Sequence, residues 1–263
     1  MGDIAAQDVK ALRDATGAGM MDAKRALVEA NGDHEAASQA LREKGLAKAA
    51  GRSDRDSTEG AIGLAMEVSR AALVHLRCET DFSAKSEGFV SLVDDLASAV
   101  LEEGEGAQET LATALDDLRL LIKENVEVGH VALIEAAEGN LIDTYLHRQD
   151  GRGVNGVVLE ASGVDQETLH QIALHVAFAK PTALSREEIP SNLVEAERAA
   201  LLDITKAEGK PQQAWDKIVE GRLSAWFREK VLLEQGLHGE KTTVQEALGE
   251  GQILRFVQVH IDD

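Results

Sequence analysis

Three short stretches in the first 45 residues place small, mostly apolar side chains at the three- and four-residue spacing of a helix. The positions are Val9, Leu12 and Thr16, then Ala23, Leu27 and Ala30, and then Ala37, Ala40 and Leu41. Glycine-containing loops at 17–19 and 31–32 separate the stretches, and Gly45 stands where the end of a helix favours glycine. The pattern predicts a three-helix domain over residues 1–45.

Apolar periodicity lapses between residues 46 and 59, where small and charged side chains predict a linker. Beyond the linker the period becomes two, because Ala72, Val74, Leu76 and Cys78 alternate with the residues of a second face. This alternation predicts a half-buried strand that points Cys78 into the core. A helical stripe follows, with Ser86 as the expected N-cap, at Phe89, Leu92, Val93, Leu96 and Val100.

The order of strand and helix recurs in the second part of the chain. Further strands are expected at 131–136, 141–147, 156–161 and 253–261. The first two are expected to pair as a hairpin across Glu138-Gly139-Asn140. One helix, over 166–178, is expected to pack through Leu169, Ile172, Ala173 and Val176. The sequence therefore predicts an α+β core with antiparallel sheets in two related halves, residues 60–140 and residues 141–190 with 236–263.

Residues 191–235 have the pattern of a helical hairpin. Two helical segments, 193–208 and 211–230, flank Gly209-Lys210-Pro211, and each would be roughly 25 to 30 Å long at about 1.5 Å per residue. Arms of this length are expected to project from the core as a coiled-coil module. The apolar positions expected to join them are Leu193, Ala196, Ala200, Ile204 and Ala207, with Trp215, Ile218, Val219, Leu223 and Trp226 opposite.

Composition narrows the choice of partner and compartment. The chain has 27 Lys and Arg against 47 Asp and Glu, a formal charge of −20, so its surface repels nucleic acid and anionic membranes. One cysteine excludes an internal disulfide and fits a reducing compartment. Residues 1–4 lack the basic start of a signal peptide, and no apolar run approaches the roughly 20 residues of a membrane helix. We expect a cytoplasmic protein.

Most candidate catalytic arrangements fail on spacing. Gly17-Ala18-Gly19 is half of a dinucleotide-binding fingerprint, but it lies between helices instead of after a strand. His170 and His175 are five residues apart, so one helix cannot aim both at one zinc ion. Cys78 and His75 belong to opposite faces of their strand, which separates a thiol nucleophile from that base. We therefore predict that the protein is not an enzyme and needs no cofactor or metal.

One acidic helix keeps an enzymatic alternative open. Asp94, Asp95 and Glu102 could serve a metal-dependent hydrolase, but they lie off the apolar stripe of their predicted helix. Charged residues at such positions form a solvated face in most proteins. Calorimetry with divalent metal would separate the two interpretations.

Thr80, Asp81 and Phe82 form the most informative segment. They place a carboxylate and an aromatic ring on a short polar connector between the predicted strand and helix. Aromatic residues are rare in this chain, which has five Phe, two Trp and one Tyr, so an exposed ring would be a strong candidate contact. The alternative is that Phe82 packs beneath the helix at Phe89 and that Asp81 is a cap or turn residue.

Several separate motifs resemble, in order, the signatures of the bacterial elongation factor Ts family. They are VKALR (9–13), TGAGMMDAKRAL (16–27), NGD (31–33), CETDF (78–82), ALHVA (173–177), GKP (209–211), KIVEGRL (217–223), VLLEQ (231–235), KTTV (241–244) and RFV (255–257). The resemblance spans the chain. It implies a guanine nucleotide exchange factor for the translational GTPase elongation factor Tu, with an N-terminal domain related to ubiquitin-associated domains.

The resemblance also implies roles for particular residues. Thr80, Asp81, Phe82 and Ser83 would form the element that intrudes near the nucleotide and Mg²⁺ of the GTPase. The N-terminal domain would contact the GTPase domain through Arg13, Met20 and Met21. His147 and His175 would be weaker candidates for contacts with a β-barrel domain of the partner. Ser83 departs from the apolar residue, such as Val, that is usual in the family, so we expect a less well braced loop.

A second interpretation keeps the resemblance of the N-terminal domain but not the activity. In it the protein is a scaffold that binds partners through this domain without accelerating nucleotide release.

Overall fold

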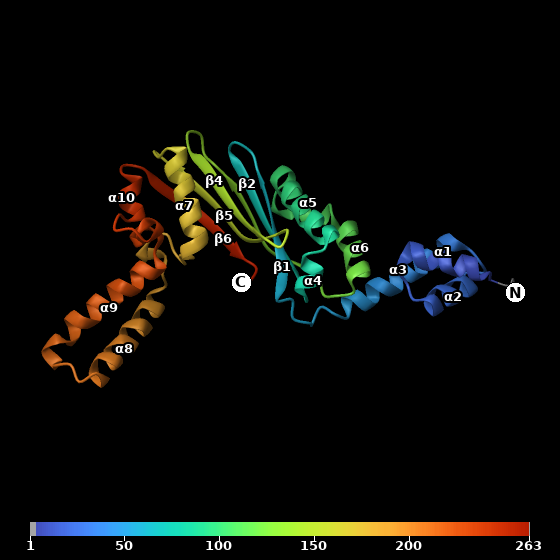
Figure 1. Ribbon diagram of the computed structural model, residues 1–263, viewed down its shortest axis with the longest axis horizontal. Helices are drawn as coiled ribbons and strands as arrows, with labels where there is room; N and C mark the ends of the chain where they lie inside the picture. The colour runs from blue at the N-terminus through green and yellow to red at the C-terminus, as the bar shows by residue number, and fades with distance from the viewer. Residues whose placement is uncertain (1–3, 263) are drawn as a thin grey trace.

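The computed structural model describes residues 4–262, with the side chain of Gln108 excepted, and shows an elongated α+β protein (Figure 1). Residues 1–3, which belong to the segment considered for a signal peptide, and Asp263 lie outside the described residues. A three-helix domain occupies one end, two sheets with their helices form the middle, and a helical hairpin extends from the other end.

The N-terminal helices are α1 (Ala6–Thr16), α2 (Met20–Glu29) and α3 (His34–Ala50). The predicted apolar faces meet in a small core of Val9, Leu12, Ala23, Ala26, Leu27 and Ala37. Gly17 ends α1 with a positive φ of 64°, and the Asp33 side chain caps α3 by accepting hydrogen bonds from two backbone N–H groups. The three predicted helices are therefore present.

The third helix does not end at Gly45, as the sequence predicts, but continues to Ala50. Residues 46–50 consist of Leu, Ala and Lys, which all favour helix. Gly45 lies against α6 (Ala112–Ile122), where a Cβ atom would come within 2.4 Å of Leu120 Cδ2. The glycine thus permits close packing of α3 on the core instead of stopping the helix, and the first five residues of the expected linker are helical.

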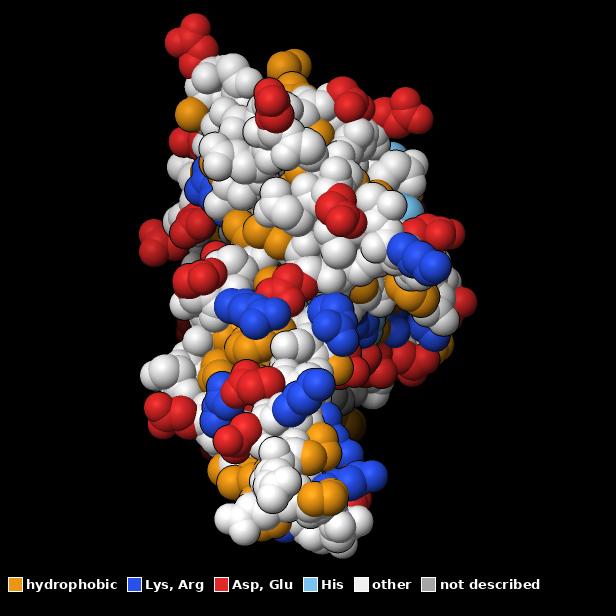
Figure 2. Space-filling view, turned by 90° about the vertical axis from the view of Figure 1, so that its left-hand side faces the viewer, with side chains coloured by type: hydrophobic (Ala, Val, Ile, Leu, Met, Phe, Trp, Pro, Cys, Tyr) orange, Lys and Arg blue, Asp and Glu red, His pale blue; other side chains and the backbone are white. Residues whose placement is uncertain are grey.

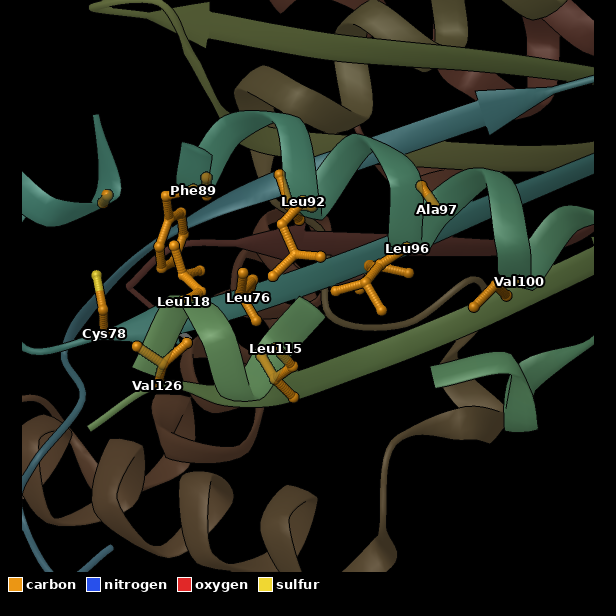
Figure 3. Packing of buried hydrophobic residues seen from close by; sticks show 14 of the residues in the cluster. Leu76, Cys78, Phe89, Leu92, Leu96, Ala97, Val100, Leu115, Leu118 and Val126 are labelled. Atoms are coloured by element: carbon orange, nitrogen blue, oxygen red, sulfur yellow. The ribbon is translucent and has the colours of Figure 1, made fainter. Parts of the chain in front are cut away.

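The first half of the core is a sheet of β1 (Glu59–Met66), β2 (Arg70–Cys78) and β3 (Glu127–Glu135), antiparallel in that order. Helix α5 (Glu87–Glu103) covers one face, and its predicted stripe is buried against the strands and α6 (Figure 3). Cys78 is fully buried in the same cluster, as expected. Strand β1 and helix α6 are not among the elements predicted from the sequence.

The second half repeats this design with β4 (Leu141–Gln149), β5 (Arg152–Ser162) and β6 (Gln252–His260), antiparallel in that order. Helix α7 (Gln166–Ala179) packs on this sheet through its predicted stripe, and the short helix α10 (Val244–Leu248) joins the same cluster. Two related α+β halves are therefore present.

The predicted hairpin between residues 131–136 and 141–147 is wrong, because β3 pairs with β2 and β4 pairs with β5. The connection crosses from one sheet to the other instead of turning back within one. Glu160 on β5 holds it there, since its Oε1 accepts hydrogen bonds from Ala137 N (3.1 Å) and Asn140 Nδ2 (2.8 Å).

Strand β2 is buried on both faces instead of one. Its second face carries Ala71 and Leu73, which pack with Ile142 and Val158 of the other sheet. Glycines allow the sheets to approach closely, since a Cβ atom at Gly153 would lie 2.2 Å from the carbonyl oxygen of Ile62. The alternation in the sequence showed one apolar face only, because the partner of the other face lies far away in the chain.

The hairpin consists of α8 (Ser191–Ala207) and α9 (Trp215–Lys230), joined by a turn with a short 3₁₀ segment, Gln212–Ala214. It projects, as predicted, and mixed acidic, basic and apolar side chains cover the lower part of the molecule where it lies (Figure 2). The expected stripe of α8 is wrong, because Leu193 is 52 % and Ile204 49 % exposed. Val194, Leu201 and Thr205 face α9 instead.

The remaining elements are short. They are α4 (Asp81–Ala84) and the 3₁₀ segments Glu105–Glu109, Arg186–Glu188, Leu232–Glu234 and Leu237–Gly239. Helix α4 lies in the middle part of the molecule, beside β1 and below α5 in Figure 1.

Candidate functional site

The connector after β2 forms the one-turn helix α4, and Thr80 caps it. Thr80 Oγ1 accepts a hydrogen bond from Ser83 N at 3.2 Å. Ser86 stands at the N-cap of α5, as expected, but its side chain makes no cap hydrogen bond and donates to the Ser83 carbonyl oxygen at 2.7 Å. These bonds tie the start and the end of the connector to each other.

Phe82 projects into solvent with 85 % of its surface exposed. The alternative that it packs beneath the following helix is wrong, because Phe89 fills that position and is fully buried. The ring therefore has most of its burial energy, about 1.5 to 3 kcal/mol for a large apolar side chain, available for a contact with another molecule.

Asp81 precedes Phe82 and stands at the first position of α4, so Thr80, not Asp81, is the cap. Its Oδ2 accepts a hydrogen bond from Lys85 Nζ at 2.8 Å, and this bond lowers the pKa of Asp81. Lys85 Nζ also lies 3.2 Å from Asp150 Oδ2, in the turn between β4 and β5. The connector thus presents an ionised carboxylate beside an exposed aromatic ring.

Ser83 is buried, with 7 % of its surface exposed, and its Oγ donates a hydrogen bond to Glu124 Oε1 at 2.6 Å. The hydroxyl thus supplies a bond that an apolar side chain could not make, whereas the expectation of a less well braced loop stays a prediction. Sequence reasoning missed Glu124, which lies between α6 and β3, where no periodic pattern draws attention to it.

The N-terminal candidates lie at the start of α2 and in α1. Met20 and Met21 are 46 % and 72 % exposed beside the glycine loop, which suits an adaptable apolar contact. Arg13 pairs with its neighbour Asp14, at 2.7 Å between Nη2 and Oδ1. The core contacts this domain where Lys123 Nζ donates to the Gly17 carbonyl oxygen at 3.4 Å.

The two histidine candidates have different environments. His147 is exposed on β4, with its Nδ1 3.3 Å from the Tyr145 hydroxyl. His175 is 3 % exposed, its Nε2 lies 2.9 Å from Gln235 Oε1, and its Nδ1 accepts a hydrogen bond from His238 N. Burial lowers the pKa of His175, so the ring is neutral and lies inside the chain.

Helix α7 also carries a ring that sequence reasoning missed. Phe178, near its C-terminal end, is 85 % exposed. Its position outside the predicted stripe of residues 169, 172, 173 and 176 was the available signal.

Residues considered for catalysis make structural contacts. Burial raises the pKa of the Cys78 thiol to about 12, which removes its nucleophilic form. Asp94 faces Arg148, with Oδ1 and Nη2 3.7 Å apart, and burial raises its pKa. Within residues 4–262 no three His, Cys, Asp or Glu side chains gather as a metal site. None of the helices in this range is long and apolar enough to cross a membrane.

Comparison with known sequences decides the family. The sequence model described as "Elongation factor TS" matches residues 79–262, a range that begins at the connector bearing Phe82 and ends after β6. The chain belongs to the elongation factor Ts family. The resemblance of the motifs is thereby confirmed, and with it a role in translation elongation.

Curated members of the family match nearly the whole chain. Elongation factor Ts of Cutibacterium acnes is 41 % identical over 271 residues, 97 % of each chain. That of Clavibacter michiganensis subsp. michiganensis is 41 % identical over 247 residues, 89 % of each chain. That of Ruegeria sp. is 38 % identical over 273 residues, which cover 99 % of this chain and 93 % of the relative.

Proposed function

We propose that this protein is a guanine nucleotide exchange factor for the translational GTPase elongation factor Tu, acting in the cytoplasm. The observation that carries the proposal is the pairing of an 85 % exposed phenylalanine with an ionised aspartate on one capped helical turn. Family membership supports the choice of elongation factor Tu as the partner. The fold supplies a firm element that presents both side chains together.

Phe82 acts as a wedge. A large ring that leaves water for an apolar gap between partner helices gains about 1.5 to 3 kcal/mol. This gain is available only if the gap opens, so the binding energy of the ring favours the opened form of the GTPase.

Asp81 acts on the metal site. Mg²⁺ demands near-ideal octahedral oxygen coordination, so a small displacement of its ligands or waters weakens it sharply. Two close unit charges interact by roughly 4 kcal/mol at an effective dielectric constant of 20, so a diphosphate that loses its divalent ion loses several kcal/mol of affinity. When the partner binds, Asp81 leaves its ion pair with Lys85 and brings its negative charge close to the Mg²⁺ site.

No covalent step is needed. Because coupling between two ligands is reciprocal, a factor that weakens GDP binding is itself weakened by bound nucleotide, and GTP can eject it. The protein therefore acts by differential binding and is not an enzyme, and it needs no cofactor or metal of its own.

Further contacts extend along the molecule. Met20 and Met21, with Arg13 nearby, contact the GTPase domain from the N-terminal helices. His147 contributes a weaker contact with the barrel domain. The ring of His175 is buried and bonded to Gln235, so it supports the packing of α7 and does not touch the partner. The exposed ring of Phe178 makes the contact from α7 instead.

The test is stopped-flow release of fluorescent GDP from elongation factor Tu, with millimolar Mg²⁺ and with EDTA. The protein is expected to accelerate release in Mg²⁺. Asp81→Asn should lose most of this acceleration in Mg²⁺ and little in EDTA, where the ion is already absent. Glu87→Gln, which removes an exposed carboxylate close to the connector, is the matched control and should behave like the unmodified protein.

Two outcomes would reject parts of the proposal. If the unmodified protein binds the GTPase without accelerating release, the scaffold interpretation holds instead. If Asp81→Asn loses the same factor with and without Mg²⁺, the aspartate does not act through the metal.

A further inference from the structure

Glu124 faces the start of the Phe82 connector from the segment between α6 and β3, directly after Lys123, whose φ of 63° ends α6. Its Oε2 accepts hydrogen bonds from the backbone N–H groups of Glu79 (3.1 Å) and Thr80 (3.0 Å). Its Oε1 accepts from Thr80 Oγ1 (2.7 Å) and Ser83 Oγ (2.6 Å). One carboxylate thus accepts four hydrogen bonds, its full capacity, from the two ends of one turn.

The contact between the two segments is reciprocal. Glu79 Oε1 accepts a hydrogen bond from Asn125 N at 2.7 Å, and Arg55 Nη1 lies 3.3 Å from the same oxygen. Asn125 Nδ2 in turn donates to the carbonyl oxygen of Arg55 and to Ser57 Oγ, both at 2.9 Å. The segment 124–125 therefore joins the connector to the chain that leads from the N-terminal domain.

We propose that Glu124 is a positioning residue that holds α4, and with it Phe82 and Asp81, in the orientation that the GTPase binds. This proposal rests on the exchange function proposed above. An isolated helix of one turn is unstable in water, and an exposed ring contributes no packing that would fix its own backbone. Buried Ala84 anchors the end of the turn in the core. The start of the turn and Ser83 are held by the hydrogen bonds to Glu124, so the orientation of Phe82 depends on that carboxylate.

The consequence for binding is preorganisation. A connector that is already ordered loses less conformational freedom when the partner engages it, so the same contacts give a higher affinity. Removing Glu124 should weaken association and leave the contacts made by Phe82 and Asp81 intact once they form. The half-saturating concentration of the factor should rise, and the release rate at saturation should stay nearly unchanged.

Ser83 belongs to the same hydrogen-bond network around Glu124. Its hydroxyl is a donor that reaches Glu124 from the far end of the turn, so its effect should depend on the carboxylate. Ser83→Ala should raise the half-saturating concentration by about threefold and Glu124→Ala by about tenfold, because the first removes one hydrogen bond to the carboxylate and the second removes all four. The double variant should be no worse than Glu124→Ala alone, since both changes remove one shared interaction.

The experiment is a titration of GDP release against factor concentration for Glu124→Gln, Glu124→Ala, Ser83→Ala and the double variant. Glu124→Gln keeps the shape of the side chain, and we expect an intermediate rise in the half-saturating concentration. Glu138→Ala, at an exposed glutamate in another connection of the core, is the matched control and should change neither parameter. A melting curve of each variant shows whether the core is intact.

The outcomes separate the two proposals. If the unmodified protein accelerates release and the Glu124 variants saturate at the same concentration, Glu124 has no positioning role and the exchange function stands. A Glu124→Gln variant that melts like the unmodified protein but loses its saturating rate would also overturn positioning. If the unmodified protein does not accelerate release, the exchange function fails, and the positioning role fails with it.

Discussion

The two halves of the core make the same connection in different ways. In the second half, three residues join β5 to α7, Asp165 caps the helix directly through Thr168 N, and Val164 packs against the core. In the first half, residues 79–86 join β2 to α5 and include the extra turn α4, which exposes Phe82. The second half shows that the fold needs no such turn. The longer connection has its own hydrogen-bond support, and we propose that it is an addition for binding.

The largest expected effect concerns the buried counterpart of Phe82. Phe89→Ala should lower the free energy of unfolding by about 3 to 5 kcal/mol, because a fully buried ring leaves a cavity between α5 and the sheet. Chemical denaturation followed by circular dichroism measures this loss. Phe82→Ala should leave stability within about 0.5 kcal/mol, as exposed positions usually do. Equal losses for the two variants would contradict the assignment of one ring to the core and one to solvent.

A smaller effect is expected at the short connection of the second half. Asp165→Ala removes the side chain that caps α7, so the melting temperature should fall by about 2 to 4 °C. The rate of GDP release at saturation should not change, because this connection exposes no large apolar side chain comparable to Phe82. Calorimetry and the release assay together check both parts. A large loss of release rate would mean that the second connection also acts on the GTPase.

The smallest expected effect is a pH dependence of stability that comes from the second half alone. Burial lowers the pKa of His175 in the second half, so below its ordinary value near 6.5 the unfolded chain binds a proton that the folded chain does not. The contribution of His175 to the free energy of unfolding is fully present above that pH, and it is lost as the pH falls toward the lowered pKa. His175→Gln should therefore flatten the decline of the melting temperature as the pH falls below about 6.5. An unchanged pH profile would show that another group controls it.

Local periodicity predicted the core helices α5 and α7, but not α6. The stripes of α5 and α7 are strong enough to specify a buried face, and Phe89 and Leu169 lie where the spacing places them. Strand β1 was missed because glycines interrupt its pattern. Gly63 is required there for contact, since a Cβ atom would lie 2.2 Å from the carbonyl oxygen of Val93 in α5.

Contacts between residues that are far apart in the sequence could not be predicted in the same way. The hairpin of β3 and β4 was expected because the two strands are neighbours in sequence, whereas each pairs within its own sheet. The same limit applies to the site. An exposed aromatic residue on a polar connector is visible in the sequence, but the carboxylate that holds it comes from Glu124, 44 residues after Thr80.

The central claim is that Phe82 on its extra turn, and not the core as a whole, accelerates nucleotide release. The most direct measurement compares Phe82→Ala with Val68→Ala, an apolar residue that is 95 % exposed in the turn between β1 and β2, in stopped-flow release of fluorescent GDP. At a subsaturating factor concentration, Phe82→Ala should slow release by about 10- to 100-fold, the equivalent of losing about 1.5 to 3 kcal/mol. Val68→Ala should release GDP at the unmodified rate. Equal rates for Phe82→Ala and Val68→Ala would contradict the account.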